Sequence, residues 1–288
     1  MTSDKSLTTG EFRRSAGPAW PALRPAGLPG LSPNSLPASV LAPAQVPAGP
    51  LGRFWRTAVD LIYPRQCLAC GEWIDYSCAG HVCPGCAAKI IMIGAERCGR
   101  CAMPLGPYTE PQDECPHCRG ADLRFCGASA PCRYVGVVRE LVHALKYKTA
   151  TCLAPAFAEL MIADLTATGI VNNVTLVMPV PLHRQKQANR GYNQAELLAQ
   201  RMTARCRLPL ATGHLVRVRN TPTQTALTRS EREQNLRGAF EVRRAERFKD
   251  QSVLLCDDVM TTGATASECA RVLRAAGAKA VYVSVLAR

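Results

Sequence analysis

The segment that decides the fold reads V-L-L-C-D-D-V-M-T-T-G-A-T and spans Val253–Thr265. Apolar residues run directly into Asp257 and Asp258, and a short turn rich in Thr and Gly follows. Two adjacent acids are a poor choice for stability at the end of a buried strand, because like charges repel each other and lose their hydration there. We therefore interpret the pair as part of a ligand site.

The sequence around this segment alternates between helical and extended patterns from about residue 131 onward. Apolar residues recur at helical spacing in four stretches, which are 137–145, 153–168, 191–202 and 264–277. Continuous apolar runs that predict strands lie at 174–180, 252–256 and 279–287. This alternation predicts an α/β fold, in which helices cover both faces of a parallel sheet. Ligands of such sheets bind at the carboxyl ends of the strands, where the two acids lie.

The turn after the acids is typical of a cradle for a single phosphate group. Its backbone N–H groups lie at the positive end of the following helix, and its hydroxyls add further donors. Gly263 permits a backbone angle that other residues resist and lets a ligand approach closely. No Gly-Lys-Ser/Thr follows, so the turn is not a Walker loop. The residues expected to hold the phosphate are Thr261, Thr262, Gly263, Ala264 and Thr265.

Asp257 and Asp258 precede the cradle and should face whatever is attached to the phosphate. Carboxylates only accept hydrogen bonds, which suits the adjacent 2′ and 3′ hydroxyls of a ribose, alongside Mg²⁺. Phosphate cradle and acidic pair together predict a ribose 5-phosphate site.

Residues 64–128 contain four C-x-x-C pairs, a spacing that lets a tight turn aim two thiolates at one metal ion. Two pairs complete a four-cysteine zinc site, whose binding free energy replaces the core that so short a segment lacks. We predict two structural zinc sites, although a crossed pairing of the turns also fits. Cys78 and Cys126 fit no pair, and His81 and His117 could replace a thiolate, but none of these four residues is expected to be a ligand. The two predicted sites are Cys67/Cys70/Cys83/Cys86 and Cys98/Cys101/Cys115/Cys118.

Composition limits the remaining possibilities. A chain of 288 residues accommodates one α/β domain and something smaller. Residues 1–52 are rich in Pro and Ala, which predicts a disordered extension. They contain no signal peptide, and no window has the ~20 apolar residues of a membrane helix. We therefore expect a cytoplasmic protein without membrane insertion, whose 15 cysteines bind metal rather than form disulfides.

The net charge of +13 indicates an anionic partner, and most of it lies in one region. Between residues 182 and 249 there are 15 Lys/Arg and 5 Asp/Glu, which gives +10. Charge alone favours a solvated basic surface.

The opening segment closely resembles the 5-phosphoribosyl 1-pyrophosphate (PRPP) signature of type I phosphoribosyltransferases, with Cys256 where an aliphatic residue is common. Two further stretches resemble the ComF (competence) branch of that superfamily. They are M-P-V-P-L-H-R-Q-K-Q-A-N-R-G-Y-N-Q and T-P-T-Q-T-A-L-T-R-S-E-R-E-Q-N-L-R-G-A-F. Members of that branch also have a cysteine-rich zinc region before the transferase domain. The resemblance extends over residues 67–288.

The resemblance implies a double zinc ribbon at 64–128 and a phosphoribosyltransferase-like domain at 131–288. Mg²⁺ would accompany PRPP, with Asp257 and Asp258 as catalytic residues near the ribose. Arg184 and Arg190 would bind the pyrophosphate, because Arg offers forked donors to phosphate oxygens. Gly191, Tyr192 and Asn193 would shape the following turn. A mobile flap is expected at Thr223–Asn235, with Gln224, Arg229, Arg232 and Asn235, and weaker candidates are Lys146 and Tyr147.

Two functions follow from these features. One is a phosphoribosyltransferase of unknown acceptor, since the sequence offers no general base and no base-recognition element. The other is a binding protein linked to DNA uptake, in which PRPP regulates contact with single-stranded DNA and no transfer occurs. Tyr147, Tyr192 and Phe240 are too scattered for a base-stacking platform and are expected in the core.

Overall fold

The computed structural model describes residues 65–74, 80–106, 115–221 and 229–288. The predicted extension at 1–52 and Cys78 lie outside these ranges. None of the described helices combines the length and apolar character needed to cross a membrane.

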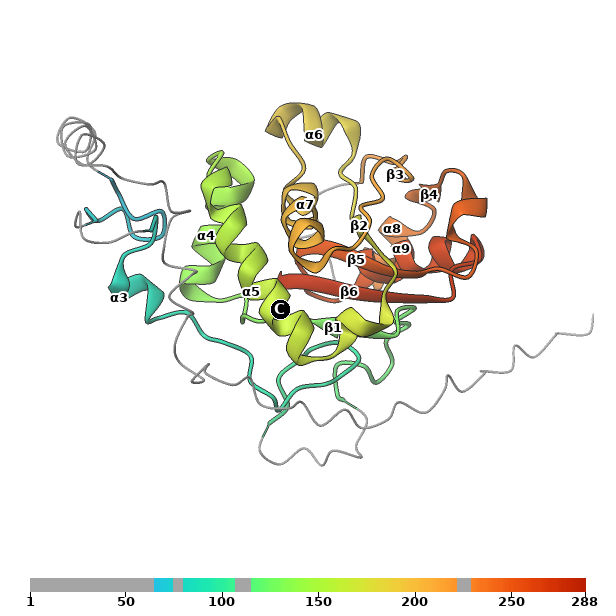
Figure 1. Ribbon diagram of the computed structural model, residues 1–288, viewed down its shortest axis with the longest axis horizontal. Coiled ribbons are helices and arrows are strands. Elements are labelled where there is room, and N and C mark those ends of the chain that lie inside the picture. The colour runs from blue at the N-terminus through green and yellow to red at the C-terminus, as the bar shows by residue number, and fades with distance from the viewer. Residues whose placement is uncertain (1–64, 75–79, 107–114, 222–228) are drawn as a thin grey trace, which may run out of the picture.

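A four-stranded parallel sheet lies at the centre of the larger domain (Figure 1). Its order is β1-β6-β5-β2, and each neighbouring pair is parallel. The carboxyl ends of the strands therefore meet at one edge. The strands are β1 (Gly127–Ser129), β2 (Leu176–Pro179), β5 (Ser252–Val259) and β6 (Ala280–Ala287).

The side chains of β5 show how the sheet is covered on both faces. Val253 and Leu255 join an apolar cluster with α9 (Ala264–Ala275), whereas Leu254 and Cys256 join a second cluster. This alternation follows from the two-residue period of a strand. The second cluster contains residues of α4 (Gly136–Tyr147), α5 (Ala154–Ala167) and α7 (Gln194–Cys206). The predicted parallel sheet with helices on both faces is confirmed.

Several elements were not predicted from the sequence. The helix α6 (Arg184–Arg190) occupies the stretch expected as a loop, and it buries no residue, so no apolar periodicity marks it. The antiparallel pair β3 (Leu215–Arg217) and β4 (Phe240–Val242) is too short for a recognisable alternation. Further short elements are α3 (Pro84–Ala87), α8 (Arg229–Leu236) and the 3₁₀ turns Thr151–Leu153, Ile170–Asn173 and Ala245–Phe248.

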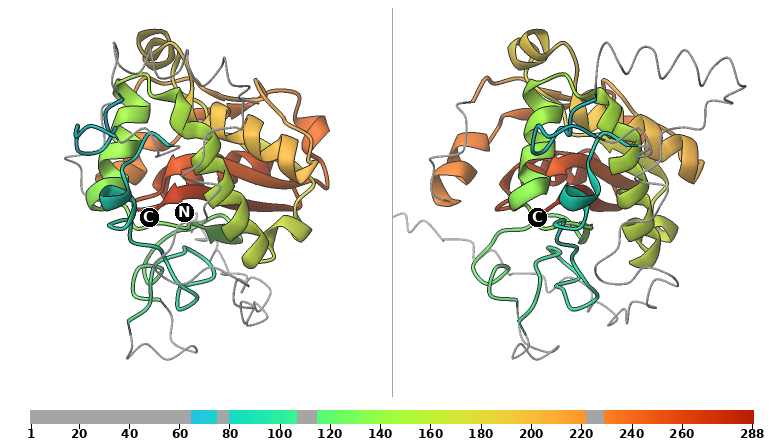
Figure 2. Two further views of the ribbon diagram at one scale, coloured as in Figure 1. Left: turned by 60° about the vertical axis from the view of Figure 1, so that its left-hand side comes forward. Right: turned by 90° about the vertical axis from the view of Figure 1, so that its left-hand side faces the viewer.

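The cysteine-rich region packs against the sheet domain at two separate places (Figures 1 and 2). The segment with the first tetrad lies beside α4, where Val137 contacts its small apolar cluster. The segment with the second tetrad lies below β1 and β6 and shares the α9-side cluster. Because β1 pairs with β6, the strand joins the large sheet although it lies across the domain boundary predicted at 128.

A buried ion pair fastens this region to the sheet domain. Arg97 lies 2.7 Å from Asp164 of α5, and the two side chains are 8% and 6% exposed. The carboxylate also accepts a hydrogen bond from Ser129 of β1 at 2.7 Å, and Arg97 donates to the Ala130 carbonyl at 3.1 Å. Removing one partner would leave a buried charge without compensation.

Asp164→Ala should therefore lower the free energy of unfolding by about 3–5 kcal/mol, because Arg97 would remain buried and unpaired. Urea unfolding followed by circular dichroism measures the change. Glu159→Ala on the same helix is the control, since Glu159 lies 4.0 Å from Arg205 in an exposed pair. Its expected cost is below about 1 kcal/mol. Equal losses of unfolding free energy in the two variants would contradict the stabilising role of the Arg97–Asp164 ion pair.

Candidate functional site

The residues predicted to cradle a phosphate lie between the end of β5 and the start of α9. Gly263 lies between them with φ +82°, a left-handed conformation that favours glycine. No hydrogen bond joins the backbone N–H of Thr261, Thr262 or Gly263 to another described residue. These donors at the positive end of α9 suit an anion. The loop from Thr261 to Thr265 lines a hollow of about 80 Å³.

A larger cleft of about 510 Å³ opens beside this loop. Asp257, Asp258 and Thr265 line it. Cationic side chains from α4, α6 and β3 also line it, namely Lys146, Lys186, Arg190 and Arg217. The cleft therefore presents both acidic and basic groups beside the loop.

The negative charge of Asp258 is compensated by other side chains of the protein. The residue is 2% exposed, Lys146 of α4 lies 2.5 Å from its Oδ2, and Gln194 of α7 donates to its Oδ1 at 3.1 Å. Burial by itself raises the pKa of Asp258, but the Lys146 ammonium and these hydrogen bonds outweigh burial and lower it. Burial likewise disfavours the charged form of Lys146, yet the Asp258 carboxylate keeps the pKa of Lys146 above its ordinary value.

Asp257 differs from its neighbour. It is half-buried, and it lines both the cleft and the hollow. Burial, followed by the adjacent Asp258 charge, raises its pKa well above the ordinary value. Both carboxylates line the cleft, as expected for a pair that faces a ligand, but their surroundings differ. Asp258 already has a cation partner, and Asp257 is the more accessible acid of the pair.

The end of α4 contributes more to the lining of the cleft than the sequence indicated. Lys146 and Tyr147 were only weaker candidates, but both line the cleft. Tyr147 is 63% exposed, with the Arg190 guanidinium carbon 5.2 Å from its ring centre, so the expectation of a core residue was wrong. Tyr192 donates to the Leu145 carbonyl and holds this end of α4 in place. Phe240 is buried as expected.

The two arginines expected at the pyrophosphate are placed differently. Arg190 lines the cleft, whereas Arg184 is exposed at the start of α6 and is not among the lining residues. Lys186 lines the cleft in its place and donates to the Thr221 carbonyl at 3.0 Å. Burial and the nearby charges of Arg217 and Arg190 lower the pKa of Lys186. Residues four apart lie on the same face of a helix. A sequence-based prediction of a helix at 184–190 would therefore have placed Lys186 on the same face as Arg190.

The expected flap is described only in part. Residues 222–228, which include Gln224, lie outside the described ranges, as does the side chain of Arg229. Arg232 of α8 donates to the Thr261 hydroxyl at 3.1 Å, so this part of the segment touches the cradle. Asn235 is half-buried, and its amide nitrogen has no hydrogen-bond partner among the described residues.

The eight cysteines form the two expected groups, not the crossed ones, and within each group the sulfur atoms lie within 4.8 Å of one another. Measured Sγ–Sγ distances are 3.8 Å for Cys70–Cys83 and 3.7 Å for Cys98–Cys118. Four sulfurs at the usual Zn–S distance on a tetrahedron stand about 3.8 Å apart. Burial raises the pKa of Cys67, but backbone hydrogen bonds, first from Cys83, lower it to about 7. The two tetrads are consistent with two structural zinc sites.

The other candidate ligands stand apart from these groups. His81, His117 and Cys126 belong to neither tetrad. His117 instead lies beside the Arg288 guanidinium. The Nδ1 atom of His117 is 2.8 Å from Nη2 of Arg288.

Comparison with known proteins finds two families that match separate parts of the chain. Residues 58–119 match the double zinc ribbon domain, and residues 188–288 match the phosphoribosyl transferase domain. The chain is 29% identical over 227 residues to Competence protein F of Haemophilus influenzae, covering 77% of this chain and 96% of that protein. It is 26% identical over 227 residues to the DNA utilization protein YhgH of Escherichia coli, with coverages of 78% and 94%. Competence protein ComFC of Streptococcus pneumoniae is 26% identical over 243 residues, with coverages of 77% and 100%.

Replacing Lys146 by Met should destabilise the fold in a pH-dependent way. In the native protein the lowered pKa of Asp258 means that the pair stabilises the fold above about pH 4 and is lost below. Without the ammonium, burial raises the Asp258 pKa, so the variant should lose about 3–5 kcal/mol near neutral pH. The loss should shrink as Asp258 becomes protonated toward about pH 5. Urea unfolding across this pH range measures it.

The double variant Lys146→Met with Asp258→Asn is the matched control, because it removes both charges while Gln194 keeps an acceptor. Its stability should recover most of the loss and show little of the extra pH dependence. A loss in Lys146→Met that is constant between about pH 5 and 8 would contradict the role of the ion pair.

Proposed function

We propose that this chain, a homologue of Competence protein F and of the YhgH DNA utilization proteins that joins a double zinc ribbon domain to a phosphoribosyl transferase domain, binds PRPP. The observation on which the proposal rests is the cleft between the α9 cradle and the basic groups of α6 and β3. The cleft and the adjoining hollow present amide donors, an accessible carboxylate and cations, which suit the phosphate, ribose and pyrophosphate of PRPP.

Each part of PRPP has a matching set of groups. The 5-phosphate fits the N–H and hydroxyl groups of Thr261–Thr265. Asp257 suits the ribose hydroxyls, with Asp258 held in place behind it by Lys146. Arg190, Lys186 and Arg217 suit the pyrophosphate.

Magnesium is the expected companion of the pyrophosphate. Mg²⁺ prefers oxygen ligands, and the Asp257 carboxylate is the donor that the cleft presents. The ion would neutralise charge on the pyrophosphate when bound. The protein's own groups would position the ligand.

As a transferase, the protein would catalyse displacement at the anomeric carbon. A nucleophile forms a bond to that carbon while the bond to the pyrophosphate oxygen breaks, and the pyrophosphate leaves with the electron pair. Asp257 stabilises the positive charge that develops on the ribose, and Arg190 and Lys186 stabilise the departing anion. The acceptor would supply the nucleophile. The described residues that line the cleft include no histidine or glutamate, and Asp257 is assigned to the ribose, so no lining residue is assigned as general base.

The second candidate is a binding protein in which PRPP occupancy regulates contact with single-stranded DNA. The names of the relatives refer to competence and DNA utilization, and the basic region at 182–249 adjoins the cleft. Phosphate contacts from Lys and Arg would make such DNA binding strongly dependent on salt.

Pyrophosphate release from PRPP, with and without single-stranded DNA, separates the two candidates. Steady release with any acceptor favours the transferase. Tight PRPP binding without release, together with DNA retention that weakens steeply with salt, favours the regulated binding protein. No measurable PRPP binding under either condition would reject both.

The double variant Asp257→Asn with Asp258→Asn should abolish PRPP binding in calorimetry, because it replaces the charged acceptors for the ribose hydroxyls and Mg²⁺ by neutral amides, each with one carbonyl acceptor only. Zinc content should stay at about two ions per chain, since both tetrads are separate from the acids. Retained PRPP affinity in a variant with intact zinc content would end the assignment.

Lys186→Ala should weaken PRPP binding by about tenfold or more, because Lys186 lines the cleft and its charge would meet the pyrophosphate. Arg184→Ala on the same helix removes an equal charge outside the cleft, so its effect should stay within about twofold. Calorimetric titration with PRPP and Mg²⁺ compares the two. A larger effect at Arg184 would restore the sequence-based prediction.

A further inference from the structure

The segment that follows the second tetrad packs directly on the phosphate cradle. A Cβ atom placed on Gly263 would lie 3.1 Å from Leu123 Cδ2 and 3.6 Å from the Phe125 ring. Leu123 and Phe125 are 5% and 2% exposed. They share one apolar cluster with Met260 and Ala264 of the loop and with the tetrad residues Cys101, Cys115 and Cys118. Apolar contact is therefore continuous from the second tetrad to the cradle.

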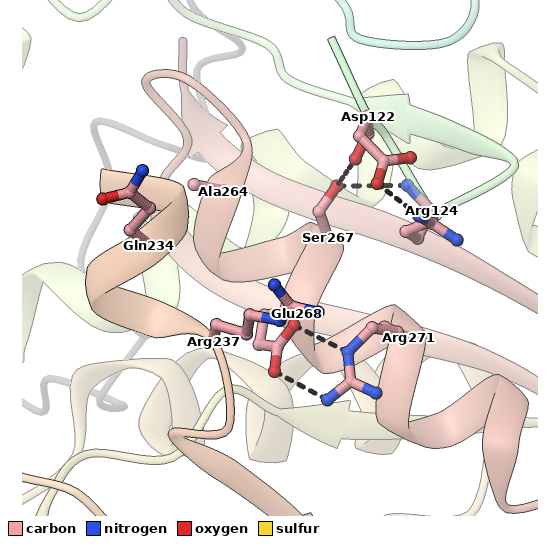
Figure 3. Close-up of a pocket in the computed structure, with 8 residues that line it drawn as sticks. All are labelled: Asp122, Arg124, Gln234, Arg237, Ala264, Ser267, Glu268 and Arg271. Carbon is pink, nitrogen blue, oxygen red and sulfur yellow. Dashed lines mark hydrogen bonds and ion pairs between the residues drawn. The ribbon is translucent and has the colours of Figure 1, made fainter. Parts of the chain in front are cut away.

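Hydrogen bonds reinforce this contact at the first turn of α9. The Ser267 hydroxyl accepts from the Arg124 backbone N–H at 3.1 Å and donates to the Asp122 carbonyl at 3.0 Å. Figure 3 shows the Ser267 side chain of α9 pointing toward Asp122 and Arg124, which belong to the segment that follows the second tetrad. The N-terminal end of α9, whose position sets the direction of the cradle amides, is thus attached to the ribbon segment.

Arg288 joins the cradle to the second tetrad. Its Nη1 donates to the Met260 carbonyl at 3.0 Å and to the Thr261 carbonyl. Its Nη2 lies 2.8 Å from Nδ1 and 3.0 Å from Nε2 of His117. His117 stands inside the C-P-H-C turn of the tetrad. One guanidinium therefore contacts both the loop backbone and the metal-binding turn.

We infer that the second zinc ribbon is a structural support of the 5-phosphate cradle, with Arg288 as the positioning residue between them. A zinc ribbon keeps its shape only with its metal bound. Zinc at the second tetrad and phosphate at the cradle are then energetically coupled, so each increases the affinity for the other. The inference rests on the proposed PRPP site.

The first ribbon provides an internal comparison. Its cluster of Cys67, Ile74 and Cys86 packs against Val137, in the first turn of α4. Val137 belongs to the apolar cluster on the face of the sheet opposite α9. Zinc at the first tetrad should therefore have little effect on the cradle.

Arg288→Ala tests the positioning role with three probes: PRPP, ribose 5-phosphate and pyrophosphate. Calorimetry should show about tenfold weaker binding of PRPP and ribose 5-phosphate, while pyrophosphate affinity is unchanged, because only the cradle is disturbed. Arg288→Lys should recover much of the loss, since an ammonium can still donate to the two carbonyls. A general structural defect would weaken all three probes alike and would not be rescued by Lys.

Cysteine variants test the coupling to zinc. Cys118→Ser and Cys70→Ser should each lose about one zinc ion per chain. Binding of ribose 5-phosphate should fall by about tenfold in the first variant and by less than about twofold in the second. Equal effects of the two variants would overturn the inference.

A measurement on the unaltered protein avoids variants that fail to fold. The distribution of zinc between the protein and a chromogenic chelator is measured at equilibrium, with and without saturating PRPP. One of the two ions should be bound about tenfold more tightly when PRPP is bound, because coupling of binding free energies is reciprocal. Equal zinc affinities with and without PRPP, despite normal PRPP binding, overturn the inference alone. Absence of PRPP binding to the unaltered protein removes the proposed function and the inference together.

Discussion

The buried charge of Asp258 is the constraint around which the cleft is built. A carboxylate that is 2% exposed at the end of a strand is stable only with a counter-charge and hydrogen bonds. Lys146 supplies the charge from α4, and Gln194 supplies a donor from α7. These contacts bring both helices to one point on β5. They determine where the cleft lies between the helices and the sheet.

The same constraint makes the two adjacent acids chemically different. Asp258 is ionised and committed to Lys146, whereas Asp257 stays half-buried with a raised pKa at the edge of the cleft. A cationic ligand group or a metal ion near Asp257 would favour its ionised form. The neighbouring acids thus divide into one that supports the site and one that can meet a ligand. Two acids with identical surroundings could not both support the site and meet a ligand in so buried a position.

The cysteine-rich region supplies structural support that a segment of its size could not build from apolar residues. Zinc would replace the missing core in each ribbon. The second ribbon then extends the α9-side cluster through Leu123 and Phe125 to the cradle, and the buried Arg97–Asp164 pair links this region to α5. The second tetrad, the sheet and the Thr261–Thr265 loop are therefore parts of one contact network.

Sequence alone determined those features whose evidence is local in the chain. Apolar runs predicted the central strands, C-x-x-C spacing predicted the metal-binding turns, and D-D-V-M-T-T-G-A-T predicted the cradle at the end of β5. The helix α6 and the strands β3 and β4 were missed because they bury few residues and are short. Only the tertiary structure decided which turns share a tetrad, that Lys186 lines the cleft in place of Arg184, and that Lys146 reaches Asp258. Such pairings depend on the rotation of helices and the register of strands, which bring together residues that no local pattern connects.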